Sequence, residues 1–193
     1  MSKINQRLGL IKADIDRYVS NSDFSDIRFP KGRSNWAYLG KLVILFFKKK
    51  QQGFRTILYY RIGGLSKLIS WLFRPPYKTQ VIACPDVVGG GIYFSHAFGT
   101  ILNCRHIGYG CSFLQNIVVG NKPTLEGKPG LPYLEDNVKI GANAVIIGDI
   151  HIGNNVHIGA GAVVTKSVPD NCIVVGNPAK IVRKNGVRVD ISL

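Results

Sequence analysis

The chain has 193 residues, of which 46% are hydrophobic and 10% aromatic, and it carries a formal net charge of +14 at pH 7. This length suits one sizeable domain, or one domain with a smaller attachment, and the composition excludes an intrinsically disordered chain. The most apolar run, Leu42–Phe47, is too short to cross a membrane, which takes about 20 residues, and no nucleic-acid recognition motif accompanies the basic charge.

The cysteines form neither a CxxC pair nor a closely spaced framework; they are Cys84, Cys104, Cys111 and Cys172. Such a distribution favours free, buried thiols in a reducing compartment. Polar and charged residues are spread along the first 19 residues, which does not fit the continuous apolar region of a secretory signal. We therefore expect a cytoplasmic protein.

The positive charge is concentrated in residues 1–80, which carry 16 Lys and Arg against four Asp and Glu, a net charge of +12. Candidate partners for such a surface are an anionic membrane, an acidic glycan or a phosphate-bearing ligand. A solvated basic face without any partner is an equal alternative. Peripheral contact with the inner face of the membrane therefore stays open.

Residues 1–76 are predicted to form a basic α-helical region. Apolar residues recur there at spacings of three and four between Leu39 and Leu72, as on one face of a helix. Lys48–Lys50 and Gly53 mark a helix end or bend, and Pro75 and Pro76 close the region. Packing against the rest of the subunit is the simpler interpretation of the apolar face, and a surface resting on a membrane is the alternative.

A six-residue repeat begins in the second half of the chain. Its aliphatic positions follow one another at a constant spacing of six: Leu134, Ile140, Ile146, Ile152, Ile158 and Val164. An earlier set comprises Ile101, Ile107, Phe113 and Val119. A helix cannot use this period, whereas a chain that turns a corner every six residues can. Gly or Asn accepts the backbone angles of such corners.

Stacked coils of this kind bury a continuous apolar interior, so the repeat predicts a parallel β-helix. We place it over residues 77–185, with a short C-terminal tail at 186–193. A segment rich in Gly, Pro and Lys interrupts the repeat at 120–133. It is expected to protrude from a corner, because burial would leave its backbone polar groups unpaired.

Several segments resemble hexapeptide-repeat acyltransferases. "IGAGAVVTKSVPDNCIVVGNPAKIVRK" (Ile158–Lys184) is similar to the closing segment of that superfamily. "QGFRTILYYRIGGL" (Gln52–Leu65) looks like the helical stretch that precedes the β-helix in serine O-acetyltransferases, and "SHAFGTILNC" and "FLQNIVVGN" look like their active-site segment and the following coil. The resemblance covers roughly residues 50–185 and implies a mainly β fold, a left-handed parallel β-helix after the helical region.

The resemblance also implies a homotrimer in which acetyl-CoA lies in the groove between neighbouring subunits. His96 matches the family's catalytic histidine. Ala142 and Ala160 match positions where the backbone meets the pantetheine arm. The positions that match the region holding the nucleotide phosphates are Thr165, Lys166, Lys180 and Arg183. General physical chemistry fits these roles, because a neutral imidazole can take the proton of a hydroxyl nucleophile and cationic side chains suit phosphates.

Three family positions differ in this chain. Ile82 falls where the family has an Asp, Ser95 replaces the acidic residue just before the histidine, and Leu131 lies near the place of a second histidine. These losses favour a different acceptor. We therefore expect acetyl transfer to a hydroxyl of a sugar or glycan precursor of surface polysaccharide, with His96 as general base. The alternatives are serine O-acetylation for cysteine synthesis and a non-catalytic scaffold that binds a partner through its basic helices.

The remaining histidines have less specific interpretations. His106 is the main rival for the role of base, because it lies only ten positions after His96. His151 and His157 occupy the last position of regular repeats and are expected on the surface. Their spacing does not suggest three histidines converging on zinc, so we expect no metal site. Ser95 lacks a nucleophile-elbow motif, which disfavours a serine nucleophile.

Overall fold

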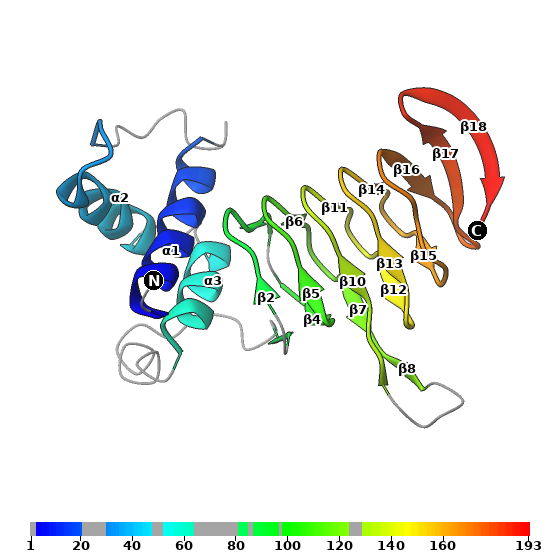
Figure 1. The fold of residues 1–193 in the computed structure, drawn as a ribbon, viewed down its shortest axis with the longest axis horizontal. Helices are drawn as coiled ribbons and strands as arrows, with labels where there is room; N and C mark the ends of the chain where they lie inside the picture. Colours follow the sequence, from blue (N-terminus) through cyan, green and yellow to red (C-terminus); the bar gives the residue numbers. More distant parts are fainter. Residues whose placement is uncertain are drawn as a thin grey trace. The chain divides into compact units, whose positions relative to one another are not determined.

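The computed structural model describes residues 3–20, 30–47, 52–63, 81–84, 87–96, 98–123 and 129–193 (Figure 1). The chain divides into two compact units. The helical unit takes in Met1–Lys78 together with the short segment Gly90–Tyr93, and the β-helical unit takes in Thr79–Gly89 and Phe94–Leu193. The first unit therefore includes a short segment that lies, in the sequence, between two stretches of the second.

The helical unit contains the predicted N-terminal helices, which are confirmed as α1 (Lys3–Val19), α2 (Asn35–Phe47) and α3 (Gln52–Ile62). Each helix contributes apolar side chains at helical spacing to one core, in which the fully buried residues are Ile15, Tyr18, Leu45, Phe54 and Ile57. The rings of Tyr18 on α1 and Phe54 on α3 meet edge to face at 5.3 Å between centroids. The helices are thus packed on one another through their apolar faces.

Helix α2 begins at a side-chain cap. The Ser34 hydroxyl accepts a hydrogen bond from the Ala37 N–H at 3.2 Å, which satisfies one of the backbone donors left free at a helix start. The helix ends at Phe47; Lys48–Lys50, where an end or bend was predicted, lie outside the described residues. No described helix combines the length and apolar character needed to cross a membrane.

The β-helical unit is built from short strands. Its first coils contain β1 (Val81–Ala83), β2 (Val87–Val88), β3 (Tyr93–Phe94), β4 (Ile101–Asn103), β5 (His106–Ile107), β6 (Ser112–Phe113) and β7 (Val118–Gly120). The repeat region contains β10 (Tyr133–Leu134), β11 (Lys139–Ile140), β12 (Val145–Ile147), β13 (His151–Ile152), β14 (His157–Ile158) and β15 (Val163–Val164). Pairs of these strands are parallel.

Successive strands go to three different sheets in turn, with orders β1-β4-β7-β12-β15, β13-β10-β5-β2 and, for the coil strands of the third sheet, β14-β11-β6-β3. Leu134 pairs with Ile152, Ile140 with Ile158 and Ile146 with Val164. Every partner is therefore three repeats, or one complete coil, further along the chain. Figure 1 shows these coils following one another from green to orange. The predicted parallel β-helix of hexapeptide repeats is confirmed in this arrangement.

The repeated aliphatic side chains fill the interior of the coil. Leu134, Ile140, Ile146, Ile152 and Val164 are completely buried. One earlier position differs from the prediction, because Ile101 is 42% exposed and its neighbour Leu102 is 1% exposed. Strand β4 pairs Leu102 with the buried Val119. The inward position of this coil is therefore shifted by one residue, and alternation along the strand turns Ile101 outward.

The corners of the coil use the residues that tolerate left-handed backbone. Asn116, Asn137, Asn143, Asn155 and Asn171 all have φ between +54° and +60°, a region that Asn enters more readily than most residues. Three of them also form a ladder across coils. The Asn137 amide donates to Asn155 Oδ1 at 3.3 Å, and the Asn155 amide donates to Asn171 Oδ1 at 3.0 Å.

Two hairpins depart from the coil. Strands β8 (Lys122–Pro123) and β9 (Pro129–Gly130) pair antiparallel within the predicted insertion, and Figure 1 shows them projecting from the unit. At the other end, β16 (Cys172–Val175) pairs in parallel with β14, and β17 (Lys180–Lys184) and β18 (Val187–Ser192) continue the sheet antiparallel. This reversal covers the last coil, as terminal elements of repeat proteins do.

Candidate active site

His96 lies in an irregular excursion of the chain between β3 and β4. Its side chain is exposed, and its backbone has φ of +52°. A left-handed conformation is uncommon for a residue other than glycine and is found more often at functional sites. The Phe98 N–H donates to the His96 carbonyl at 2.7 Å. His96 is therefore held in a tight turn that presents its imidazole to solvent.

Backbone hydrogen bonds fix this turn on both sides. Before it, the Ser95 N–H donates to the Phe113 carbonyl at 2.9 Å. After it, the Asn116 N–H donates to the Phe98 carbonyl at 2.9 Å. The buried Thr100 then donates its hydroxyl to the Leu114 carbonyl at 3.0 Å. The next coil thus supplies the rigid surface on which the His96 turn rests.

No carboxylate in the described part of the chain is hydrogen-bonded to the His96 imidazole. The three positions that differ from the family resemblance are all among the described residues. Ile82 is in β1, where it pairs with Leu102; Ser95 and Leu131 are half-buried, directly before His96 and after β9. Among the described residues, the backbone hydrogen bonds of the turn are therefore what restricts the orientation of His96.

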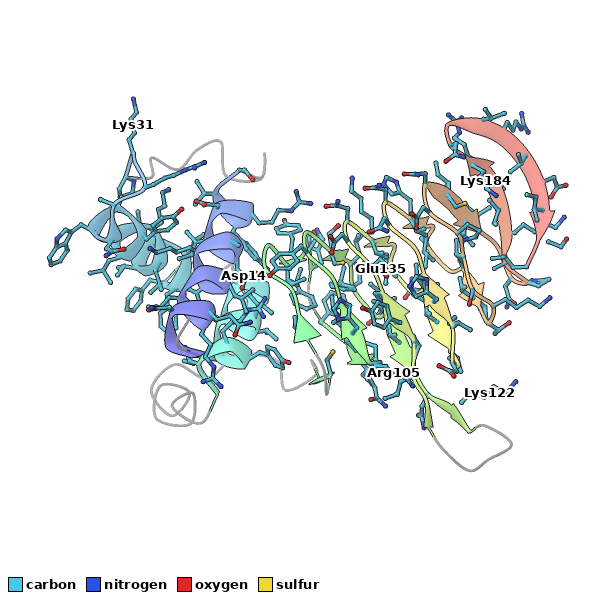
Figure 2. All side chains as sticks on the ribbon, in the orientation of Figure 1. Asp14, Lys31, Arg105, Lys122, Glu135 and Lys184 are labelled. Carbon is cyan, nitrogen blue, oxygen red and sulfur yellow. The ribbon has the colours of Figure 1, made fainter. Side chains whose placement is uncertain are left out.

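The rival histidine, His106, takes part in a ladder of stacked rings. Tyr133 pairs with His106 on one side and His151 on the other. The ring centroids lie 4.3 Å apart for His106 and Tyr133 and 5.3 Å apart for Tyr133 and His151. His151 Nε2 lies 2.9 Å from Glu135 Oε1, the carboxylate labelled in Figure 2. Ring stacking thus accounts for the placement of His106.

His151 and His157 are exposed, in agreement with the surface position predicted for them. Partial burial and, secondly, the positive charge of Lys139 lower the pKa of His157. Lys139 is its direct partner across β11 and β14. Within the described ranges, no three His, Cys, Asp or Glu side chains are grouped in a way that could hold a metal ion.

The two alanines expected beside a pantetheine arm occupy the same corner of adjacent coils. Ala142 follows β11 and Ala160 follows β14, and the Gly161 N–H donates to the Ala142 carbonyl at 2.9 Å. A Cβ atom on Gly141 would lie 2.5 Å from the Ala160 nitrogen. The two coils therefore approach too closely at this corner for any residue except glycine at position 141.

The four residues expected near phosphates are all exposed. Thr165 and Lys166 follow β15, while Lys180 and Arg183 lie on β17. Lys180 Nζ is 3.4 Å from Asp190 Oδ1. Among the described residues, neither Thr165 nor Lys166 is joined to β17 by a hydrogen bond or an ion pair.

One buried polar cluster was not predicted from the sequence. Asp14 and Arg61 are 1% and 5% exposed and form an ion pair within the helical unit. A signal for it exists in the sequence, because Asp14 adjoins Ile15 and precedes Tyr18 by one helical turn, on the apolar face of α1. A carboxylate in such a position needs a buried partner.

Comparison with known proteins identifies the repeat. Residues 132–166 match the family model described as bacterial transferase hexapeptide (six repeats). A serine acetyltransferase of Synechococcus elongatus is 40% identical over 149 residues, which cover 72% of this chain and 60% of that protein. One of Staphylococcus aureus is 38% identical over 104 residues, 53% of this chain and 48% of the relative. The chain thus spans less than two thirds of these relatives.

Solved structures agree with these relatives. The serine acetyltransferase of Neisseria gonorrhoeae has a TM-score of 0.63 and 25% identity, covering 96% of this chain and 67% of that chain. The same enzyme in complex with serine has a TM-score of 0.60 and 27% identity, with coverage of 93% and 70%.

The prediction of a sugar or glycan hydroxyl as acceptor, and with it a role in polysaccharide biosynthesis, is wrong. The relatives at 38–40% identity are serine acetyltransferases. An acceptor site is formed by several groups, so the absence of some of them does not define what the others bind. The repeat of residues 132–166 thus matches the hexapeptide family of bacterial transferases, and the chain is similar to serine acetyltransferases over 72% of its length.

Proposed function

We propose that this protein transfers the acetyl group of acetyl-CoA to the hydroxyl of serine, with His96 as the general base. The observation that carries the proposal is the exposed His96 in a left-handed turn, on a chain that is 40% identical to a serine acetyltransferase over 72% of its length. The coil is left-handed in this proposal, as the hexapeptide repeat implies.

Direct transfer needs a proton acceptor for the hydroxyl. The neutral imidazole of His96 takes that proton while the serine oxygen attacks the thioester carbonyl carbon. The tetrahedral intermediate then expels the CoA sulfur, which receives the proton from the imidazolium. General-base catalysis of this kind contributes about 10²–10⁴-fold.

Acetyl-CoA would bind along the side of the coil. Ala142 and Ala160 leave the backbone of adjacent coils accessible to an extended pantetheine arm, because neither carries a long side chain. Lys166, Lys180 and Arg183 are exposed cations that could pair with the phosphates of the nucleotide. Lys180 Nζ lies 3.4 Å from Asp190 Oδ1. On binding of the nucleotide, this ion pair would be replaced by one between Lys180 and a phosphate.

The acceptor is tested by measuring thiol release from acetyl-CoA with the purified full chain. Release is expected with L-serine and not with a panel of sugars and nucleotide sugars offered at the same concentration. His96→Asn serves as the matched control for spontaneous hydrolysis, since Asn tolerates the left-handed backbone. Mass spectrometry of the product distinguishes O-acetylserine from other acetylated products.

Two results would contradict the proposal. Thiol release that depends on a sugar and not on serine would return the acceptor to a carbohydrate. Absence of acetyl-CoA binding in calorimetry would leave a non-catalytic scaffold as the better description. In that case the basic residues of α1–α3 become the region to test for a partner.

We further propose that three subunits associate through the sheet that contains β4, β7, β12 and β15. Its outward positions form an apolar ladder, in which Ile101 pairs with Val118, Val118 with Val145 and Val145 with Val163. Ile101 and Val118 are 42% and 36% exposed. An exposed apolar strip on one sheet favours burial between copies of the chain. A closed ring of copies would make the same contact in every subunit.

Val118→Asp is expected to dissociate a trimer into monomers, because it places a charge in the centre of that strip. Sedimentation velocity measures the change directly. Lys139→Asp, on the outward side of β11 in a different sheet, is the matched control and should leave the assembly intact. A wild-type monomer, or a trimer unaffected by Val118→Asp, would contradict this assignment of the interface.

The membrane contact expected for the basic N-terminal region stays a prediction. Lys48–Lys50, which motivated it together with the adjoining apolar run, lie outside the described residues. The exposed Trp36, Leu39, Val43 and Phe47 of α2 are the described part of that surface.

A further inference from the structure

Cys84 and Cys104 stand at the ends of two neighbouring strands of the β-helical unit. Cys84 directly follows β1, and Cys104 directly follows β4. The two strands are paired in parallel up to Ala83 and Asn103, so the cysteines are the next two residues in the same register. Adjacent strands lie about 4.7–4.9 Å apart, and a disulfide spans about 4.4–6.8 Å between Cα atoms. The backbone therefore places the two cysteines within the range of a disulfide.

The side chains of the two cysteines also meet. A hydrogen bond joins the two thiols. Cys84 Sγ lies 3.1 Å from the carbonyl oxygen of Arg105, to which it donates; Arg105 is the residue after Cys104 and is labelled in Figure 2. Cys104 is completely buried, whereas Cys84 is partly exposed. One cysteine of the pair is thus shielded, and the other can be reached from solvent.

The remaining cysteines have other surroundings. All four cysteines are free thiols, and the predicted burial is confirmed for each of them except Cys84. Cys111 and Cys172 each donate to a backbone carbonyl, at 3.2 Å and 3.4 Å. Cys111 precedes β6 and Cys172 begins β16, and these two strands are not paired with each other. Of the four cysteines, which are all described, the register of the coil therefore brings together Cys84 and Cys104.

The surroundings give the two thiols different roles in an oxidation. The hydrogen bond with Cys84 and, secondly, burial raise the pKa of the Cys104 thiol. Because the thiolate is the form that attacks a disulfide, Cys104 is the poorer nucleophile of the two. Cys84 is also the more accessible. Cys84 is therefore the thiol that meets an external oxidant first, and Cys104 is the one placed to react with it afterwards.

We propose that Cys84 and Cys104 are a site of reversible oxidation, at which a low-molecular-weight disulfide such as oxidised glutathione converts the two thiols into an intramolecular disulfide. The site lies within the β-helical unit alone. It goes beyond the proposed acetyl transfer and does not depend on it.

The oxidation consists of two thiol–disulfide exchanges. In the first, the Cys84 thiolate attacks one sulfur of oxidised glutathione; the S–S bond of the glutathione breaks, and one glutathione leaves and takes up a proton. In the second, Cys104 gives up its proton and attacks the sulfur of Cys84, and the other glutathione leaves as a thiol. The electrons and protons lost by the two cysteines are thus carried away by the two glutathione thiols.

The disulfide would join an edge strand to its neighbour. β1 stands at the end of its sheet, next to β4, and strands at such an end open locally more readily than inner ones. A covalent bond between the two strands would hold β1 in place. It would also close the loop of residues 84–104 in the unfolded chain, which lowers the entropy of the unfolded state. Oxidation is therefore expected to stabilise this end of the coil.

The test equilibrates the purified full chain in buffers of reduced and oxidised glutathione, blocks the remaining thiols with iodoacetamide and analyses the peptides by mass spectrometry. Trypsin leaves both cysteines on the peptide Thr79–Arg105, since no Lys or Arg lies between them. In oxidised glutathione this peptide is expected to carry an internal disulfide and no alkyl group. Cleavage after Tyr93 then gives two peptides that stay linked. Return to reduced glutathione is expected to restore two alkylated cysteines.

Stability gives a second readout. The melting temperature of the oxidised protein is expected to exceed that of the reduced protein by about 5 °C, and the backbone amides of β1 are expected to exchange about tenfold more slowly. Cys84→Ser and Cys104→Ala should each abolish both differences. Cys111→Ala is the matched control: it removes another buried thiol of the same unit and should retain the disulfide and both differences.

Three results would overturn the proposal: a Thr79–Arg105 peptide that is alkylated at both cysteines in every buffer, a Cys84 that stops at the mixed disulfide with glutathione, and a disulfide from Cys104 to Cys111. Each is read from the wild-type protein, so the decision does not depend on whether a variant folds. None of the readouts measures acetyl transfer, so failure of the proposed function would leave this test unaffected.

Discussion

Replacing His96 with alanine is expected to lower kcat for acetyl transfer to serine by about 10²–10⁴-fold, the contribution of a general base. CoA affinity and subunit association should change little, because the exposed side chain of His96 makes no hydrogen bond in the described structure. Steady-state thiol release measures the first effect, and calorimetry with CoA and sedimentation measure the others. His96→Asn is the sharper variant, since it preserves the preference for φ near +52°.

His106→Ala and His151→Ala are the controls for this prediction. Both remove an imidazole from the same unit, but from the stacked ladder on β5, β10 and β13. Each is expected to retain kcat within a factor of about three, as for a substitution away from the reacting atoms. If His106→Ala loses as much activity as His96→Ala, the general base would have to be assigned to His106, the alternative that the sequence already indicated.

Phe113→Ala is expected to lower the free energy of unfolding by about 3–5 kcal/mol, the usual cost of deleting a buried aromatic ring. Phe113 is completely buried, and its ring stacks on Phe94 at 5.3 Å between centroids. The interior of the coil is held by stacked neighbours on both sides and cannot collapse around the missing ring. Equilibrium unfolding in urea at constant pH measures the loss.

Tyr109→Ala is the matched aromatic control, because Tyr109 is in the same unit and is 56% exposed. Its hydrogen bond to Asp136 is made by the backbone N–H, at 2.7 Å, and survives the substitution. The expected change is within about 0.5 kcal/mol. Equal losses in the two variants would mean that the aromatic stack does not form part of a continuous core.

The catalytic candidate could be found from the sequence because it interrupts a regular pattern. His96 stands outside the repeat, and the segments around it resemble an active site. The acceptor could not be found in the same way. The substitutions Ile82, Ser95 and Leu131 are visible in the sequence, but their effect on acceptor recognition depends on groups from other elements, which the repeat does not reveal.

The pairing of distant side chains was also beyond the sequence. Asp14 contacts Arg61 and Ile92, which are 47 and 78 residues away, and nothing local in the chain specifies either partner. The outward turn of Ile101 is a similar case. A strict period of six predicts it to be buried, and only the register of β4 against β7 shows that Leu102 takes the inward position.

The sequence by itself determined the β-helix. The preference of an aliphatic side chain for burial and the tolerance of Asn or Gly for the backbone angles of a corner are properties of single residues. These are local properties, and the period of six repeats them often enough to define the coil. The tertiary structure decided which side chains of different coils and helices meet: the ring ladder, the apolar strip and the Asp14 cluster. Such contacts depend on the register between strands and on the packing of the helices. The spacing of the repeat specifies neither of these.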